Sequence, residues 1–168
     1  MNKKIVQVYC GTGKGKTTAA VGQCIRAASM GCEVIIIQFL KGKDAEEFSF
    51  LSKLEPDIKL FRFEKEEEFY TDLTEEQQNE EKKNIINGFN FARKVIETGG
   101  CDVLVLDEVL GLIELGIITT EDVIKLIQLR DDYVKLVMTG QKLSDELVEY
   151  VDIISEIRPI KESRQTHE

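Results

Sequence analysis

The chain has 168 residues, of which 42% are hydrophobic, so its length suits one domain with a sizeable core. Its formal net charge of −9 disfavours nucleic acid and anionic membranes as partners, because both would repel it. No apolar run approaches the roughly 20 residues of a membrane helix, and Met1–Lys4 leads straight into a strand pattern with no signal-peptide core. The cysteines form no Cys-x-x-Cys pair, which favours buried, reduced thiols. We therefore expect a cytoplasmic protein.

Strand patterns alternate with helical patterns along the whole chain. Strands are predicted at residues 5–10, 33–40, 58–63, 101–106, 134–139 and 153–159. Helices are predicted at residues 16–30, from a capping box at Thr74–Gln77 to the glycine pair 99–100, at 121–130, and at 144–150. Because several strands are continuously apolar, we expect an α/β protein with a mostly parallel sheet covered by helices on both faces.

Parallel sheets bind ligands at the carboxyl ends of their strands. Four segments that could carry chemistry follow predicted strands: Gly11–Thr18, Gln38–Gly42, Asp107-Glu108 and Thr139-Gly140. The order of elements brings these segments to one edge of the sheet, where we expect the site.

The segment Gly13-Lys14-Gly15-Lys16-Thr17 lies between a predicted strand and a predicted helix. Glycines let backbone amides turn towards a phosphate, and the helix adds its N-terminal amides and positive dipole end. Lys16, which we expect at the mouth of the site, can contact phosphates, and the Thr17 hydroxyl can bind Mg²⁺. The pattern indicates a phosphate-binding P-loop that includes Gly11, Thr12 and Thr18.

The loop departs from the standard pattern G-x-x-x-x-G-K-[ST], because the first glycine would fall on Cys10 and Gly11 comes one residue late. A dinucleotide-binding G-x-G-x-x-G fingerprint fails, since its third glycine would fall on Lys16, and a simple tight turn is the third alternative. The apolar strand that ends in Asp107-Glu108 favours the phosphate cradle, because such carboxylates hold the metal of a bound nucleotide.

These residues resemble the P-loop type of ATP:corrinoid adenosyltransferases. The resemblance covers almost the whole chain and rests on several segments: Gly11–Ala20, Arg26, Gln38-Phe39 with Lys41-Gly42, Leu106-Asp107-Glu108, Thr139-Gly140 and Ser155–Lys161. It implies a three-layer, RecA-like P-loop fold with about six strands and transfer of the 5′-deoxyadenosyl group of ATP to cobalt(I), with release of tripolyphosphate.

By the same resemblance, each matched segment acquires an expected role. Gly11, Thr12, Gly13, Lys14, Gly15, Lys16, Thr17 and Thr18 cradle the triphosphate, and Arg26 is a further phosphate contact. Lys16, Thr17 and Glu108 are the expected catalytic residues, and Thr17, Glu108 and Asp107 the expected Mg²⁺ ligands. The substrates are ATP and a reduced corrinoid. A flavoprotein reductant and a homodimer are further expectations.

The acid-rich stretch from Glu64 to Glu81 reads most simply as a solvated loop that leads into a helix. Phe69 and Tyr70 interrupt it and are the nearest counterparts of an aromatic pair that packs on the corrinoid in the family. They are therefore candidate corrinoid contacts, with ordinary packing as the alternative. His167, the only histidine, and roughly the last eight residues are expected to form a tail.

Two other functions remain open from the sequence. One is a P-loop ATPase or kinase-like protein that has kept the fold but changed its substrate. The other is a nucleotide-binding regulator without turnover.

Overall fold

The computed structural model describes residues 5–41 and 46–163, the side chains of residues 46–48 excepted. Its strands are β1 (Val6–Cys10), β2 (Val34–Gln38), β3 (Ile58–Arg62), β4 (Val103–Asp107), β5 (Lys135–Thr139) and β6 (Ile153–Glu156). Its α-helices are α1 (Lys16–Ser29), α2 (Glu46–Leu51), α3 (Glu75–Thr98), α4 (Val109–Glu114), α5 (Thr120–Leu129) and α6 (Asp145–Val148). Short 3₁₀ turns, η1 and η2, span Ser52–Leu54 and Tyr70–Asp72. Every predicted strand forms, within a few residues of its expected bounds.

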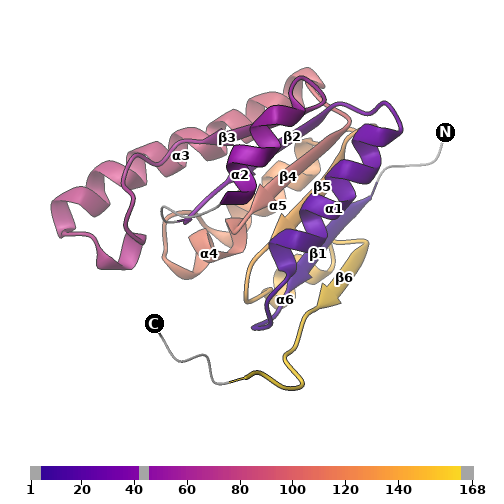
Figure 1. The fold of residues 1–168 in the computed structure, drawn as a ribbon. Coiled ribbons are helices and arrows are strands. Elements are labelled where there is room, and N and C mark those ends of the chain that lie inside the picture. Colours follow the sequence, from indigo (N-terminus) through magenta and orange to yellow (C-terminus); the bar gives the residue numbers. More distant parts are fainter. Residues whose placement is uncertain (1–4, 42–45, 164–168) are drawn as a thin grey trace.

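The strands form one six-stranded sheet in the order β3-β2-β4-β5-β1-β6, and every pair is parallel. The register aligns Gln38 with both Arg62 and Asp107, so the last residues of β2, β3 and β4 lie side by side. Helices α1 and α2 cover one face of this sheet, and α3 and α5 cover the other (Figure 1). The three-layer α/β fold expected from the sequence is confirmed.

A hydrophobic core lies on each face, because apolar side chains of the strands alternate between the two sides. On the side of α3, α5 and α4, the larger core contains Ile37, Leu104 and Leu106, none more than 1% exposed. On the side of α1, the smaller core contains Ala20 and Cys24 of the helix. The four cysteines all belong to the described residues, and no disulfide joins them.

Two helices begin at the capping boxes that hydroxyl residues make possible. Thr74 and Gln77 cap α3, as predicted, and Thr119 caps α5 together with Asp122. Ser144 precedes α6, as expected, but its hydroxyl makes no capping hydrogen bond. Helices α2 and α4, six residues each, were not predicted, because they are too short to show a helical period.

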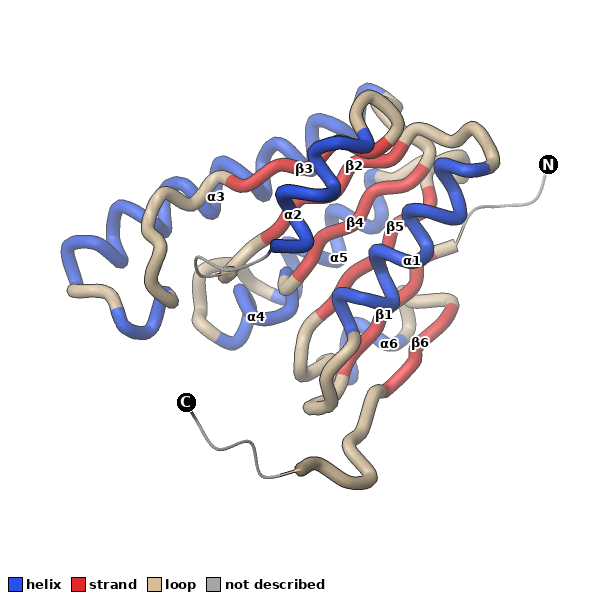
Figure 2. Tube along the Cα trace, in the orientation of Figure 1, coloured by secondary structure: helices blue, strands red, loops and turns tan. Residues whose placement is uncertain are grey.

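The carboxyl ends of the strands lie at one edge of the sheet, and the phosphate loop follows β1 at the same edge (Figure 2). The amino ends of the strands and the end of α1 lie at the opposite edge. Within the described residues, no helix combines the length and apolar character needed to cross a membrane. His167 and Gly42, which the sequence analysis singled out, lie outside the described residues.

Candidate nucleotide-binding site

The phosphate loop runs from Gly11 to Gly15 between β1 and α1. Gly11 and Gly15 have φ of 105° and 108°, which favours glycine. A Cβ atom at Gly11 would lie 2.4 Å from the Ile157 carbonyl oxygen, and one at Gly13 would lie 2.8 Å from the same atom. The segment after β6 therefore packs directly on the loop. It also joins it by hydrogen bonds, since Gly13 N–H donates to the Ile157 oxygen at 2.8 Å and Ile157 N–H donates to Cys10 at 2.8 Å.

Lys16 begins α1 and lies beneath this loop. Its ammonium group donates to the Gly13 carbonyl oxygen at 2.9 Å, and the residue is only 9% exposed. Lys16 was expected at the mouth of the site and not in the core; it is buried, and its ammonium group is bonded to the backbone of the loop. Thr12, Lys14, Gly15 and Thr18 are exposed along the loop and the first turn.

Thr17 joins the loop to the end of β4. Its hydroxyl donates to the Asp107 carboxylate at 2.9 Å and 3.2 Å. Thr139 at the end of β5 donates to Oδ1 of Asp107 at 2.6 Å, and Gln38 at the end of β2 donates to Oδ2 at 3.0 Å. Asp107 is 1% exposed, so three strand ends and the loop converge on one buried carboxylate.

Two further groups lie near this carboxylate, the Lys41 ammonium and the oxygen of the Gln38 amide whose nitrogen donates to it. The Lys41 ammonium lies 3.8 Å from Oδ2 of Asp107 and donates to the Thr17 hydroxyl at 3.2 Å. The Oε1 atom of Gln38 is buried and, among the described residues, has no hydrogen-bond partner. A buried oxygen without a donor is costly in a folded protein and is commonly satisfied by a ligand, a water or an ion.

Glu108 follows Asp107 and begins α4 with a φ of 62°, an unusual conformation for a non-glycine residue. Its N–H donates to the Thr139 hydroxyl at 2.8 Å, which fixes this turn. Burial raises the pKa of its carboxyl, and the Asp107 charge raises it further, while the Lys41 and Lys16 charges lower it. Glu108 thus lies beside the site, but Asp107 is the acid that contacts Thr17.

The donors at this place suit Mg²⁺, which prefers oxygen ligands and takes only one or two carboxylates when substrate phosphates complete its shell. Thr17 and Asp107 supply a hydroxyl and a buried carboxylate, Glu108 stands next to them, and the orphaned Gln38 oxygen adds an acceptor. Within the described residues, no cluster of three or more His, Cys, Asp or Glu could hold a metal by protein ligands alone.

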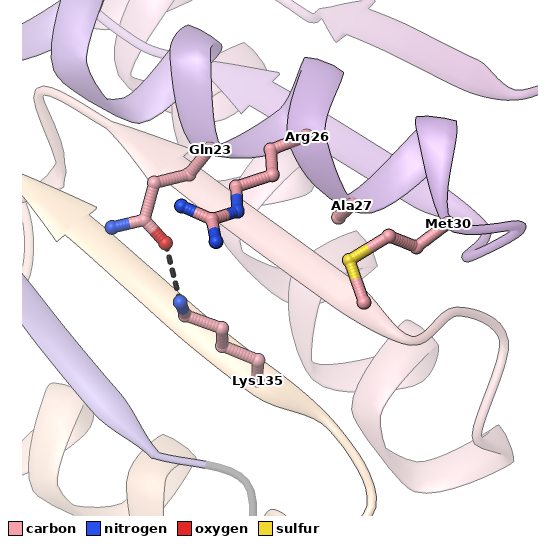
Figure 3. Close-up of a pocket in the computed structure, with 5 residues that line it drawn as sticks. All are labelled: Gln23, Arg26, Ala27, Met30 and Lys135. Carbon is pink, nitrogen blue, oxygen red and sulfur yellow. Dashed lines mark hydrogen bonds between the residues drawn. The ribbon is translucent and has the colours of Figure 1, made fainter.

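The structure does not bring Arg26 to this site. Arg26 lies ten residues after Lys16 on α1, which places it about 15 Å further along the helix. There it lines a cavity of about 400 Å³ with Gln23, Ala27, Met30 and Lys135, the first residue of β5 (Figure 3). Its expected contact with the phosphates of a nucleotide in the same chain's loop is not supported by this geometry.

Phe69 and Tyr70 lie in the segment between β3 and α3. Phe69 is 59% exposed, whereas Tyr70 packs against the larger core and its carbonyl accepts from Gln78 at 2.8 Å. Of the two aromatics, Phe69 alone is free to meet a ligand through most of its ring.

The same segment is less solvated than its composition indicates, and the expectation of a simple solvated loop is wrong at both ends. Glu81 is 3% exposed and accepts from the N–H groups of Lys65 and Glu66 at 3.0–3.4 Å. Glu64 accepts from the N–H of Leu40. Counting charges could not reveal these contacts, because both acids bind backbone amides that are distant in sequence.

The chain has a parallel sheet covered by helices on both faces and a glycine-rich loop that opens a helix. A Thr–Asp pair joins the start of that helix to β4, which is separated from β1 by one strand. These features together define a P-loop nucleotide-binding protein. A family model described as "ATP:corrinoid adenosyltransferase BtuR/CobO/CobP" matches residues 2–167. The chain belongs to this family.

Curated relatives agree with that assignment. The corrinoid adenosyltransferase of Escherichia coli (strain K12) is 30% identical over 159 residues, which cover 94% of this chain and 78% of the relative. Corrinoid adenosyltransferase CobA of Salmonella typhimurium (strain LT2) gives the same identity and coverage. The corrinoid adenosyltransferase of Pseudomonas aeruginosa is 25% identical, with 94% of this chain and 76% of the relative covered.

Among solved structures, a KaiC-like protein from Pyrococcus horikoshii superposes with a TM-score of 0.62 at 17% identity, over 97% of this chain and 76% of its own. At that identity the likeness concerns the fold alone, and it supports the RecA-like P-loop architecture.

Proposed function

We propose that the chain transfers the 5′-deoxyadenosyl group of ATP to the cobalt(I) of a corrinoid and releases tripolyphosphate. The observation that carries this proposal is the hydrogen bond between the Thr17 hydroxyl, directly after the phosphate loop, and the Asp107 carboxylate. It occurs in a chain that matches the adenosyltransferase family over residues 2–167. The named relatives add support, since each is a corrinoid adenosyltransferase.

In this reaction the cobalt(I) electron pair forms the bond to C5′ of ATP, and the bond between C5′ and the triphosphate oxygen breaks. The leaving oxygen keeps the electron pair of the broken C5′–O bond, so negative charge grows on the triphosphate. Lys16 and Lys41 stand where they can oppose this charge, and the loop amides can hold the phosphates in line. No proton has to be removed from the attacking atom, so the site needs no general base.

Mg²⁺ would be held by Thr17 and Asp107, with Glu108 beside them, and it would supply further charge for the departing triphosphate. The chain's own contribution is orientation. Asp107 fixes the Thr17 hydroxyl, and Thr139 and Gln38 fix the Asp107 carboxylate in turn. A ligand held by such supporting hydrogen bonds keeps its position while charge shifts nearby.

Exposed Phe69 is the best-placed corrinoid contact among the aromatics that the sequence singled out. Its ring would offer apolar surface to a corrin macrocycle, at roughly 25 cal/mol for each Å² removed from water. Tyr70 would support it from the core side of the segment.

Product analysis tests the proposal directly. Purified protein is mixed with Mg²⁺, ATP and chemically reduced cobalamin without oxygen, and the phosphorus products are separated. Tripolyphosphate with an adenosylated corrinoid is the expected result. ADP with phosphate would identify an ATPase or kinase-like protein instead, and binding without products would identify a regulator.

A further inference from the structure

The backbone that carries Lys41 is held at two points by residues from the end of β3. Arg62 donates through Nη2 to the Lys41 carbonyl oxygen at 2.6 Å. Both carboxylate oxygens of Glu64 accept from the Leu40 N–H, each at 3.0 Å. The sheet register explains why these groups meet. Because Gln38 is aligned with Arg62, the residues two places further, Leu40 and Glu64, leave the sheet side by side.

Leu40 adopts a φ of 59°, which is sparsely populated by leucine and persists only where the surroundings hold it. The turn it makes sends Lys41 back over the edge of the sheet, where the Lys41 ammonium reaches Thr17 and Asp107. Lys41 therefore places a second positive charge, in addition to that of Lys16, at the side of the site where the phosphates are expected.

We propose that Arg62 and Glu64 clamp the Leu40–Lys41 backbone so that Lys41 acts as a further nucleotide-binding residue, with Glu64 as its positioning residue. This inference rests on the proposed binding of ATP by the phosphate loop, and it identifies what holds one side of that site.

The clamp is anchored in α3 as well as in β3. Buried Glu81 binds the N–H groups of Lys65 and Glu66, directly after Glu64, so the segment cannot swing away without breaking these bonds. The same segment continues to Phe69, the proposed corrinoid contact.

Glu64 also gives the clamp a pH dependence. The pKa of its carboxyl is raised to about 7: burial is the largest cause and the neighbouring Glu81 charge adds to it, while the Leu40 N–H and the Arg62 charge act in the lowering direction. Protonation leaves Glu64 with one good acceptor oxygen and removes its attraction for Arg62. The clamp is consequently strongest above pH 7 and weakens as the pH falls through about 7.

The test measures the affinity of the full chain for Mg·ATP by calorimetry, without corrinoid, so that ATP is not consumed by the proposed reaction. Lys41→Ala is expected to weaken binding roughly 10- to 100-fold, the range of one charge-assisted hydrogen bond. Glu64→Ala should weaken it by a similar factor, while Glu68→Ala, which removes an exposed acid from the same segment, should leave it unchanged.

The double variant separates positioning from general support of the fold. If Glu64 acts through Lys41, Glu64→Ala causes no further loss of affinity in the Lys41→Ala background. An equal loss in both backgrounds, or no loss in either, overturns the proposal. A parent protein that does not bind Mg·ATP at all would instead overturn the proposed function.

Glu64→Gln keeps the test usable if Glu64→Ala does not fold. The glutamine oxygen still accepts from Leu40, so affinity at pH 8 should stay within a few-fold of the parent. Between pH 6 and pH 8 the parent should gain affinity relative to Glu64→Gln, because the two proteins differ only in the carboxyl at residue 64, whose pKa is about 7 in the parent. Parallel pH profiles for the two proteins would contradict the clamp, since the titration of ATP itself is common to both.

Discussion

Asp107 is the residue of the site at which two substitutions, to alanine and to asparagine, can best distinguish an effect on stability from an effect on nucleotide binding. Its carboxylate is 1% exposed and accepts hydrogen bonds from Thr17, Thr139 and Gln38. Asp107→Ala removes the acceptor for all of them, and two of these donors, on Thr139 and Gln38, are buried. A buried donor without a partner costs about 1–3 kcal/mol, so these two should together lower the free energy of unfolding by about 2 kcal/mol or more.

Asp107→Asn should be far milder, because the structure contains a compensating group. The asparagine oxygen can still accept from Thr139 and Thr17 at the position of Oδ1. Its amide nitrogen would face Gln38, whose Oε1 is the buried acceptor without a partner. A half-turn of the Gln38 amide brings that oxygen towards the new donor. The remaining loss is the charge assistance of the bonds, about 1–2 kcal/mol.

The affinity for Mg·ATP should respond differently from the stability, because Asp107→Asn should weaken binding strongly although it costs little stability. The asparagine has no charge to offer Mg²⁺, so Mg·ATP affinity should fall at least about 10-fold although most of the stability remains. Urea unfolding gives the stability of both variants, and calorimetry gives the affinity. Asp145→Asn, which changes an exposed acid, is the matched control and should resemble the parent in both measurements.

Two results would refute this reasoning. Equal destabilisation by Asn and Ala would show that Gln38 does not compensate for the lost acceptor. Unchanged Mg·ATP affinity in Asp107→Asn would show that the buried carboxylate only supports the fold.

The remaining predictions concern other parts of the site. Lys16→Ala should stay folded, with a loss of about 1 kcal/mol for its bond to Gly13, and abolish turnover; near-normal turnover would defeat the loop assignment. Glu108→Gln should raise the Mg²⁺ concentration needed for half-maximal rate, and an unchanged Mg²⁺ titration would remove Glu108 from the metal site. Phe69→Ala should impair cobalamin use far more than Mg·ATP binding, and equal effects would mean simple packing. Because the pKa of Glu64 is raised in the folded state to about 7, its contribution to stability is complete below about pH 4.5 and is lost as the pH rises through 7. Urea unfolding should therefore show the parent losing stability relative to Glu64→Gln over that range.

The architecture could be predicted from sequence because it depends on local patterns. Continuous apolar runs such as the one in β4 indicate strands buried on both faces, and alternation with helices then implies a parallel sheet. The capping box at Thr74 and the glycine stop at Gly99 placed α3 closely, since both signals act within a few residues. The loop and the strand-end acid Asp107 followed from the same local chemistry.

What the sequence could not show depends on contacts between distant segments. Nothing near Glu64 indicates that it binds the N–H of Leu40, because that pairing follows from the register of β2 and β3. For Arg26 the sequence predicted a contact that the structure does not support. The resemblance assigned Arg26 to the phosphates, but the rise of α1 places it at the far edge of the sheet, away from the loop of the same chain. Glu108 and Asp107 were both expected as Mg²⁺ ligands, and the sequence could not show that Asp107 is the one in contact with Thr17.

The central claim is that this chain makes a cobalt–carbon bond from ATP. The most direct measurement is the absorption spectrum of cobalamin, reduced chemically to cobalt(I) under anaerobic conditions, during incubation with Mg²⁺, ATP and the protein, with Lys16→Ala as control. The account predicts conversion to the spectrum of an adenosylated corrinoid by the parent, stoichiometric tripolyphosphate, and neither product with Lys16→Ala. An unchanged cobalt(I) spectrum while ATP is split to ADP and phosphate would contradict it.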